Sequence, residues 1–485
     1  MPELVVYGAT AAGVCAAVAA ARHGVQVTLL APSRHVGGMV SGGLGYTDIG
    51  DPRVVGGLAA EFRAEVAAHY GSSSYAGPEP RVAEAILTSW LSRAGVEVVF
   101  DPAMPSVSIV DRRIDAVGPY RAGVYVDASY EGDLLAAAGV SYRVGRESRA
   151  LHGEPLAGRT EPAPGKHQFM PYLNPFAADG SLLPLLDPGA EVPVGEGDGR
   201  VMAYGYRVCL SSGPSRLPFE RRDGFHDEEW ELARRYFAMV PEPGEFLGLV
   251  PNLPNGKCDG NSIGPLSLNL LDGSQQGYAD GDPPRRAEIV RRHQEYTQDF
   301  LYFMSAEGPP AVRKALSEWG FAHDEFGGGL PHQLYVREAR RMVGEYVLTQ
   351  HDLTRAAQYD TVAMGSYHMD IREVRRTWRW VYEHPDPIPS VYNEGYLSAP
   401  VPPYQIPYRC LVPRVRECRN LLVPVCVSAS HLAFSSVRME PQYEMLGHAA
   451  GLAAVEALAR DVVVQRVDVP ALQARLAEEG AVLAL

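Results

Sequence analysis

The turn after the first apolar run of the sequence carries residues that could bind a phosphate. Gly8, Thr10 and Gly13 stand where the G-x-G-x-x-G turn of a dinucleotide-binding unit carries its three glycines. Thr10 adds a Cβ at the second place, where the backbone approaches a pyrophosphate, but its hydroxyl could itself donate to a phosphate oxygen. The backbone N–H groups of Ala11 and Ala12, at the start of the next helix, would still bind the phosphate. A plain strand–turn–helix without a ligand is the alternative interpretation of this motif.

The acidic residue expected to bind a ribose is missing. About 20 residues beyond the turn, a dinucleotide-binding unit carries Asp or Glu, whereas this sequence has Ala31. The loss of a charged hydrogen bond would cost about 1.5–3 kcal/mol unless another group replaces it. Ser33 and Arg34 are close enough in sequence to do so. Because a nearby arginine also suits the 2′-phosphate of NADP, NADP is a rival cofactor on this evidence.

A strand–helix–strand unit is predicted to position these residues. Residues 3–8 form an unbroken β-branched and aromatic run, which is typical of a buried strand. Residues 11–23 are rich in alanine and predict a helix that ends before Gly24. Residues 25–30 form a second apolar run. The expected fold class is therefore α/β, with a Rossmann-like dinucleotide-binding domain.

A glycine-rich loop, "RHVGGMVSGGLGYTD", follows over residues 34–48. Its glycines permit positive φ angles and let the backbone approach something large and flat. With this loop the chain resembles flavoprotein oxidoreductases of the succinate dehydrogenase and fumarate reductase superfamily, and more closely the bacterial FAD-dependent oxidoreductases. The resemblance implies that FAD is the cofactor and that Gly37, Gly38 and Met39 run beside the flavin. His35 is spaced differently from the histidine that attaches FAD covalently in the wider superfamily.

Two more N-terminal segments resemble the same family. Residues 79–101 resemble the helix and strand that place backbone, here near Val98, against adenine. Residues 126–148 resemble the return of the chain to the FAD-binding domain, with Asp127 and Asp133 at the matching positions. The resemblance therefore implies that these residues contribute to the cofactor site.

The C-terminal part of the sequence resembles the family most closely, over residues 406–454. Residues 420–430 predict a strand that rises to a turn, and residues 440–460 predict a helix with Pro441 in its first turn. Small residues in this helix would allow close packing on the N-terminal unit. Its positive end would face the pyrimidine edge of the flavin, and the backbone groups expected there belong to Arg438, Met439, Glu440 and Gln442. A purely structural packing helix is the alternative.

If both ends of the chain build one FAD-binding domain, the middle must be inserted into it, as in the resembled family. We expect residues 1–150 and 406–485 to form the FAD-binding domain, of glutathione-reductase type, and residues 151–405 to form an α+β substrate or cap domain. The middle region is rich in Pro, Gly and aromatic residues, and it predicts helices at 284–303 and 310–319.

Three residues are candidates for catalysis. His431 precedes the expected flavin-facing helix, where an imidazole could exchange a proton with the substrate near neutral pH. The alternative is a histidine that only hydrogen-bonds the turn. Arg337 and Arg341 are spaced i, i+4 on a predicted helix within 331–352, a segment that resembles a substrate-domain signature. One of them would bind a carboxylate or carbonyl oxygen, while at least one would lie on a solvated face.

Weaker candidates for the pocket wall are His332, Tyr335, Arg207 and Tyr408. Cys410, Cys418 and Cys426 are better interpreted as core thiols, because no paired-cysteine metal motif is present. No metal is expected.

The charge and hydropathy of the sequence limit the kinds of partner that the protein could bind. A net charge of −14 argues against a nucleic-acid surface, which needs clustered Lys and Arg. No apolar run is long enough for a membrane span, and the first residues lack the pattern of a signal peptide. We therefore expect a cytoplasmic protein with a small-molecule substrate. The sequence leaves the oligomeric state open, and a homo-oligomer is compatible with it.

The sequence thus predicts an FAD-dependent oxidoreductase that transfers a hydride between a small organic substrate and the flavin. Two alternatives stay open. One is an NADP-dependent reductase built on the N-terminal unit, which Ala31 and Arg34 suggest. The other is a flavin-fold protein that has lost its redox role and serves as a binding or structural subunit.

Overall fold

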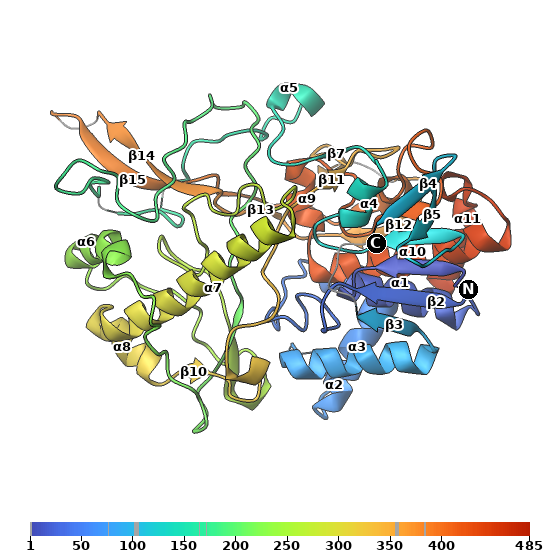
Figure 1. Cartoon of the computed structure of the whole chain (residues 1–485), viewed down its shortest axis with the longest axis horizontal. Coiled ribbons are helices and arrows are strands. Elements are labelled where there is room, and N and C mark those ends of the chain that lie inside the picture. The colour runs from blue at the N-terminus through green and yellow to red at the C-terminus, as the bar shows by residue number, and fades with distance from the viewer. Residues whose placement is uncertain are drawn as a thin grey trace.

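The polypeptide builds its central sheet from both of its ends. The structure is a computed structural model that describes residues 2–75, 77–100, 106–163, 165–170, 172–354, 358–382 and 385–485. Five parallel strands lie in the order β18-β6-β1-β2-β3. Their bounds are Leu4–Tyr7 for β1, Val27–Ala31 for β2, Glu97–Phe100 for β3, Val124–Asp127 for β6 and Leu421–Leu422 for β18. The blue and red parts of the chain therefore meet (Figure 1), and the predicted α/β, Rossmann-like fold is confirmed.

Two helices pack against each other so closely that their contact requires glycine. They are α1 (Ala11–Arg22) and α10 (Glu440–Ala459). A Cβ added to Gly447 would lie 2.1 Å from the carbonyl oxygen of Ala12. One added to Gly451 would lie 2.4 Å from a carbonyl oxygen one turn further along α1. The predicted close packing of the C-terminal helix on the N-terminal unit is confirmed.

The other elements surround this sheet or form the second half of the molecule (Figure 1). The remaining helices are α2 (Gly57–His69), α3 (Pro80–Ala94), α4 (Asp133–Ala137), α5 (Arg149–His152), α6 (Glu231–Met239), α7 (Pro283–Ala306), α8 (Pro310–Ser317), α9 (His431–Val437) and α11 (Val469–Glu478). The antiparallel strands are β4 (Val107–Val110) with β5 (Arg113–Val117), β7 (Tyr142–Arg143) with β11 (Arg341–Met342), β8 (Val208–Ser211) with both β9 (Lys257–Gly260) and β10 (Gly320–Phe321), β12 (Thr361–Gly365) with β17 (Tyr404–Pro407), β13 (Met369–Ile371) with β16 (Leu397–Ala399), and β14 (Arg375–Val381) with β15 (Ile388–Glu394).

The long helix α7 organises the second half around an aromatic core. Trp230 stacks on Phe303 with ring centroids 4.8 Å apart and on Tyr296 at 5.8 Å. Helices α7 and α8 match the helices predicted at 284–303 and 310–319. Among the described residues, no helix combines the length and the apolarity that crossing a bilayer requires.

The arginine-rich segment that was predicted to be helical is extended instead. Residues 331–340 form no helix or strand, and the chain then enters the short strand β11. The reason lies in the separate buried partners of its side chains, since Arg337 donates to the carbonyl oxygen of Ala203 whereas Arg341 contacts Glu147. A helix would have placed both arginines on one face. The prediction of a helix with a shared arginine face is therefore wrong.

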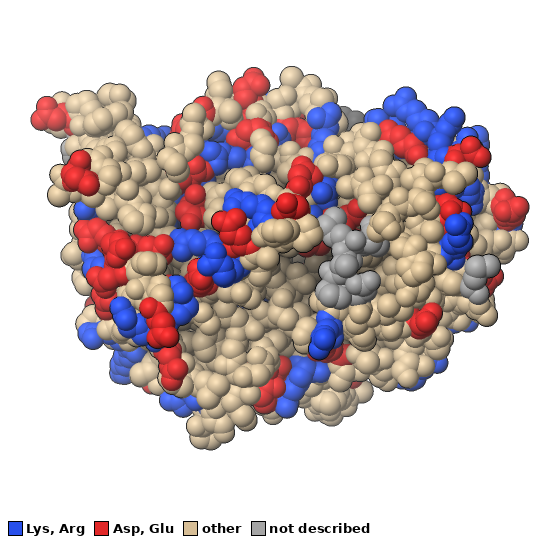
Figure 2. All heavy atoms as spheres, viewed as in Figure 1, with Lys and Arg blue, Asp and Glu red and all other residues tan. Residues whose placement is uncertain are grey.

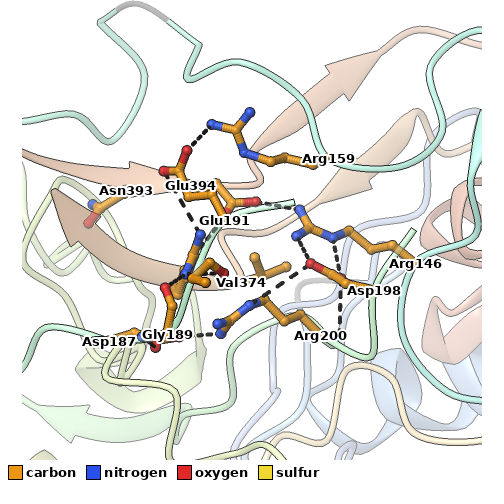
Figure 3. A network of polar contacts seen from close by, with 12 residues as sticks. Arg146, Arg159, Asp187, Gly189, Glu191, Asp198, Arg200, Val374, Asn393 and Glu394 are labelled. Carbon is orange, nitrogen blue, oxygen red and sulfur yellow. Dashed lines mark hydrogen bonds and ion pairs between the residues drawn. The ribbon is translucent and has the colours of Figure 1, made fainter. Parts of the chain in front are cut away.

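A buried ion network ties the β14–β15 hairpin to loops distant in sequence (Figure 3). Glu394 accepts hydrogen bonds from Arg146 Nη1 and Arg375 Nε, each at 2.5 Å. These three side chains are at most 2% exposed. Arg146 also donates through Nε to Asp198 at 2.9 Å. Because the loss of one partner would leave buried charges uncompensated, this network depends on Glu394.

Replacing Glu394 by glutamine should therefore destabilise the protein. The change leaves two buried guanidinium groups facing a neutral amide, and we expect the free energy of unfolding to fall by about 3 kcal/mol. The matched control is E288Q, which breaks an ion pair with Arg285 whose side chains are 57% and 46% exposed, and which should cost at most about 1 kcal/mol. Urea unfolding of both variants measures the difference. Equal effects would contradict the structural role of the network.

Candidate cofactor and substrate site

The first of two clefts opens at the carboxyl ends of β1, β2 and β6. It has a volume of about 240 Å³. Its lining comes from the turn after β1, the start of the glycine-rich loop, the segment after β6, and residues 332–334, and comprises Gly8, Ala9, Thr10, Pro32, Ser33, His35, Gly38, Ser129, Tyr130, Glu131, Tyr278, Val290, His332, Gln333 and Leu334. This is where doubly wound α/β sheets bind their ligands.

The turn after β1 keeps the geometry of a phosphate-binding turn at its first and third positions. Gly8 has a φ of +100°, and a Cβ on it would lie 2.7 Å from the backbone of Ala128. A Cβ on Gly13 would lie 1.9 Å from the carbonyl oxygen of Gly8. The Thr10 hydroxyl donates to the carbonyl oxygen of Ala128 at 2.8 Å and accepts from the N–H of Gly13 at 3.2 Å. Its hydrogen is thus used within the protein, and the first N–H groups of α1 remain as donors toward the cleft.

The loop after β2 is contacted by a carboxylate that the local sequence did not indicate. Ala31 ends β2 as predicted, and Arg34 is exposed and not part of the cleft wall. Glu84 reaches this loop from α3, where its Oε1 accepts from the N–H of Val36 at 3.1 Å and lies 3.1 Å from Nδ1 of His35. Nothing in the spacing of the β1–α1–β2 unit could have indicated a residue from α3.

Two histidines stack across the cleft wall. His35 and His332 have ring centroids 3.8 Å apart and nearly parallel planes. Neither ring nitrogen of the His332 side chain has a partner among the described residues, and burial lowers the pKa of His332 to about 4. His332 is therefore a neutral, unsatisfied side chain at the edge of the cleft, next to the predicted wall residue Tyr335.

The N-terminus of α10 is connected to the glycine-rich loop through Tyr130. The N–H of Met39 donates to the Tyr130 hydroxyl at 2.9 Å, which donates to Oε1 of Glu440 at 2.7 Å. Oε2 of Glu440 and both amide atoms of Gln442 are buried without a partner in the described part of the chain. Burial raises the pKa of Glu440 to about 8. Unsatisfied polar atoms thus gather where the sequence predicted contacts to the flavin.

A second cleft, of about 200 Å³, lies on the other side of residues 333–337. Gln333 and Leu334 line the first cleft, whereas Tyr335 and Arg337 line the second. Its wall is strongly polar and comprises Asp48, Lys166, His167, Arg207, Asn261, Tyr335, Arg337, Tyr367, His368, Asp370, Arg372, Tyr396, Arg438 and Met439. Because Arg438 and Met439 immediately precede α10, this cleft adjoins the predicted flavin-facing helix end.

His167 lines the second cleft and is held there by two charged neighbours. Its Nδ1 lies 3.0 Å from Oε1 of the buried Glu373 and 3.1 Å from Nη2 of Arg372. Although burial opposes it, the positive charge of Arg372 lowers the pKa of Glu373 to about 2. Because a guanidinium can only donate, Nδ1 of His167 is the acceptor of the Arg372 contact, which leaves Nε2–H of the neutral imidazole as a donor. The backbone of His167 has a φ of +54°, a strained conformation of the kind found at functional sites.

The predicted catalytic residues do not all lie together. Arg337 lines the second cleft, but His431 and Arg341 line neither cleft. His431 Nδ1 lies 2.7 Å from Glu338, and Arg341 contacts both Glu338 and Glu147. These four side chains form a buried cluster at the start of α9, whose other end is followed by Arg438.

Asp127 and Asp133, which the sequence predicted to contribute to the cofactor site, form hydrogen bonds and ion pairs within the protein. The Asp127 carboxylate accepts from the N–H groups of Ser129 and Leu135 at 3.0 and 2.8 Å, and burial raises the pKa of Asp127 to about 6. Asp133 pairs with Arg286 and Arg340. The cleft wall here is Ser129, Tyr130 and Glu131 instead.

The other residues predicted to form the site or its surroundings are Val98, Tyr408, the candidates for the pocket wall and three cysteines. Val98 lies within β3, paired with Leu29, and the predicted segment around it ends at Asp101, outside the described residues. Tyr408 donates to the carbonyl oxygen of Val464 at 2.7 Å. Arg207, Tyr335 and His332 do line the clefts, and Cys410, Cys418 and Cys426 are buried free thiols, as predicted.

Comparison with known proteins assigns the chain to a family. The family model described as FAD dependent oxidoreductase matches residues 3–476. The chain belongs to this family, whose cofactor is the one that the sequence predicted. No curated protein matches the chain.

Solved structures of low similarity include Thermovibrio ammonificans THI4 (16% identity over 30% of this chain and 66% of that one, TM-score 0.23). They also include L-proline dehydrogenase from P. horikoshii (16% identity over 30% of this chain and 58% of that one, TM-score 0.25). A third is thioredoxin reductase from T. acidophilum (20% identity over 26% of this chain and 34% of that one, TM-score 0.17). The chain thus matches less than two thirds of the length of each of these proteins.

The buried Glu440 carboxyl predicts a pH dependence of stability. The folded protein keeps this proton up to about pH 8, whereas an unfolded glutamate loses it near about pH 4.3. The folded state therefore binds more protons across this window, and the contribution of Glu440 makes stability fall as pH rises from about 5 to 8. E440Q should reduce this fall when the free energy of unfolding is measured at both pH values. The exposed control E318Q should follow the wild type, and a parallel response of E440Q would contradict the assignment.

Proposed function

We propose that the protein is an FAD-dependent dehydrogenase or oxidase that acts on a small organic substrate. The observation that carries this proposal is the adjacency of the two clefts, one at the strand ends that bind dinucleotides and one lined by charged groups. In this proposal residues 1–150 and 406–485 hold FAD, and residues 151–405 provide most of the substrate cleft.

The residues present fit FAD. The diphosphate would bind at the turn from Gly8 to Gly13, which presents the N-terminus of α1. The ribose would bind near Ser33, where Glu84 supplies the carboxylate that Ala31 lacks. The unpartnered atoms of Gln442 and Glu440 would hydrogen-bond the flavin. When bound, FAD supplies acceptance or donation of a hydride, which protein side chains cannot perform.

The chain's own residues must hold the substrate and move its proton. Nε2 of His167 would exchange a proton with a substrate in the second cleft, with Arg372 fixing the imidazole through Nδ1. His431, which the sequence indicated, is assigned instead to positioning α9 through Glu338, because it does not line this cleft. Replacing His167 by asparagine should lower kcat/KM by about 10²–10⁴-fold. H431N should lower kcat/KM by a smaller factor. The reverse result would return the proton transfer to His431.

The redox function is tested by the purified protein itself. We expect a yellow protein whose colour bleaches anaerobically in the presence of its substrate. A colourless protein that binds NADP would support the NADP-dependent reductase, although the exposed position of Arg34 outside the cleft favours FAD. A colourless protein that binds neither cofactor would support a redox-inactive subunit.

The position of the cofactor is tested by a matched pair of glycine variants. Gly8→Ala adds a Cβ at a φ of +100° and within 2.7 Å of backbone, whereas Gly24→Ala, at the other end of α1, adds one at +83° with nothing within 4 Å. Both changes strain the backbone, but only the first clashes with a neighbouring segment, at Ala128 and Ser129, and so displaces the turn beside the cleft. We expect G8A to weaken FAD binding at least about tenfold in a fluorescence titration, a loss of about 1.4 kcal/mol. Equal affinities in the two variants would contradict binding at this turn.

A further inference from the structure

Arg337 is a buried cation without a carboxylate partner among the described residues. Its side chain lines the second cleft, and the residue is 5% exposed. Its Nη1 donates to the carbonyl oxygen of Ala203 at 2.5 Å, and its guanidinium lies 4.2 Å from the centre of the Tyr335 ring. Burial lowers the pKa of Arg337 to about 9, and the nearby positive charges of three other arginines add to this effect. A guanidinium that lines a cleft without a carboxylate partner is stabilised by an anion that binds in that cleft.

The three neighbouring arginines already have carboxylate partners. Arg207 forms two hydrogen bonds of 2.7 Å with Asp259. Arg438 lies 3.1 Å from Asp370, and Arg372 lies 3.5 Å from Glu373. These pairs leave Arg337 as the uncompensated charge of the cleft interior.

The charges at the mouth of the second cleft do not alter the surplus positive charge of its interior. Lys166 and Asp48 line the mouth with opposite charges, and both are exposed to solvent. The molecular surface in Figure 2 likewise shows acidic and basic side chains interspersed. The interior of the second cleft therefore differs from its surroundings by one positive charge.

We propose that the substrate of this enzyme is a small organic monocarboxylate whose carboxylate binds Arg337. This inference rests on the proposed function, because it names the substrate class of the same site. The planar fork of a guanidinium matches a carboxylate through two parallel hydrogen bonds. A single surplus charge matches one carboxylate better than a phosphate monoester, which carries about −1.5 to −2 at neutral pH. The volume of about 200 Å³ limits the substrate to a small molecule.

The first test uses the wild-type holoenzyme and needs no variant. Propionate, its neutral isostere propionamide, the dianion succinate and inorganic phosphate are titrated by calorimetry at one ionic strength. We expect propionate to bind at least about tenfold more tightly than each of the others. Equal binding of propionamide would overturn the need for a charge, and tighter binding of succinate or phosphate would overturn the limit to one carboxylate.

The second test assigns the charge to Arg337. R337Q removes the cation and should weaken propionate binding at least about tenfold, while R337K keeps the charge without the fork and should fall between R337Q and the wild type. The control R379Q removes an exposed arginine that lies outside both clefts and should bind propionate as the wild type does. Unchanged affinity in R337Q would overturn the proposal. If R337Q does not fold, R337K and the wild-type panel decide the question.

Failure of this inference differs from failure of the proposed function. Calorimetry reports propionate binding whether or not the protein carries flavin. A yellow protein that does not distinguish propionate from propionamide would contradict the monocarboxylate and leave the oxidoreductase in place. A colourless protein that binds propionate through Arg337 would contradict the oxidoreductase and leave the anion site in place.

Discussion

The approach of α10 to α1 is the contact on which the rest of the structure depends. Because Gly447 and Gly451 have no side chains, the two helices approach until α10 meets the carbonyl oxygens of α1. This contact carries the start of α10 to the strand ends of the N-terminal unit. There the Tyr130 hydroxyl joins the glycine-rich loop to Glu440 through two hydrogen bonds. Three segments remote in sequence thus form one surface, and a bulkier residue at either glycine would separate them.

The second cleft concentrates features that cost folding free energy. Arg337 is buried without a carboxylate partner among the described residues, and His167 has a left-handed backbone although it carries a side chain. Either feature alone would be destabilising. Other buried arginines are compensated within the protein, as Arg146 and Arg375 are by Glu394 and as Arg376 is by three neutral acceptors. Unpaired charge and backbone strain both lower the free energy of unfolding, and both occur in this one cleft. A ligand that binds there would offset part of this loss.

The sequence predicted the elements that local chemistry determines. The β1–α1–β2 unit, the helices α7 and α8, and the first-turn position of Pro441 in α10 follow from periodicity, capping and proline geometry. The family resemblance indicated that both ends of the chain meet, and the central sheet confirms this. These features depend on neighbouring residues or on long matching segments, which are visible in one sequence.

The sequence did not predict features that depend on distant partners. The segment around Arg337 has helical charge spacing, but its side chains have buried partners from other parts of the chain that only an extended backbone reaches. His431 is adjacent in sequence to the flavin-facing helix, yet its imidazole binds Glu338. The grouping of Arg207, Arg372 and Arg438 around one cleft depends on tertiary structure alone. No local pattern contains this information.

The two departures from a dinucleotide-binding motif have different physical consequences. Thr10 replaces a glycine and uses its hydroxyl to cap α1 and to hold the backbone of Ala128. It therefore stabilises the turn within the protein itself. Ala31 offers no such local compensation. A carboxylate from another element, Glu84 on α3, instead contacts Val36 and His35 just beyond β2. The first change is thus absorbed within the motif, whereas compensation for the second requires a group from a different helix.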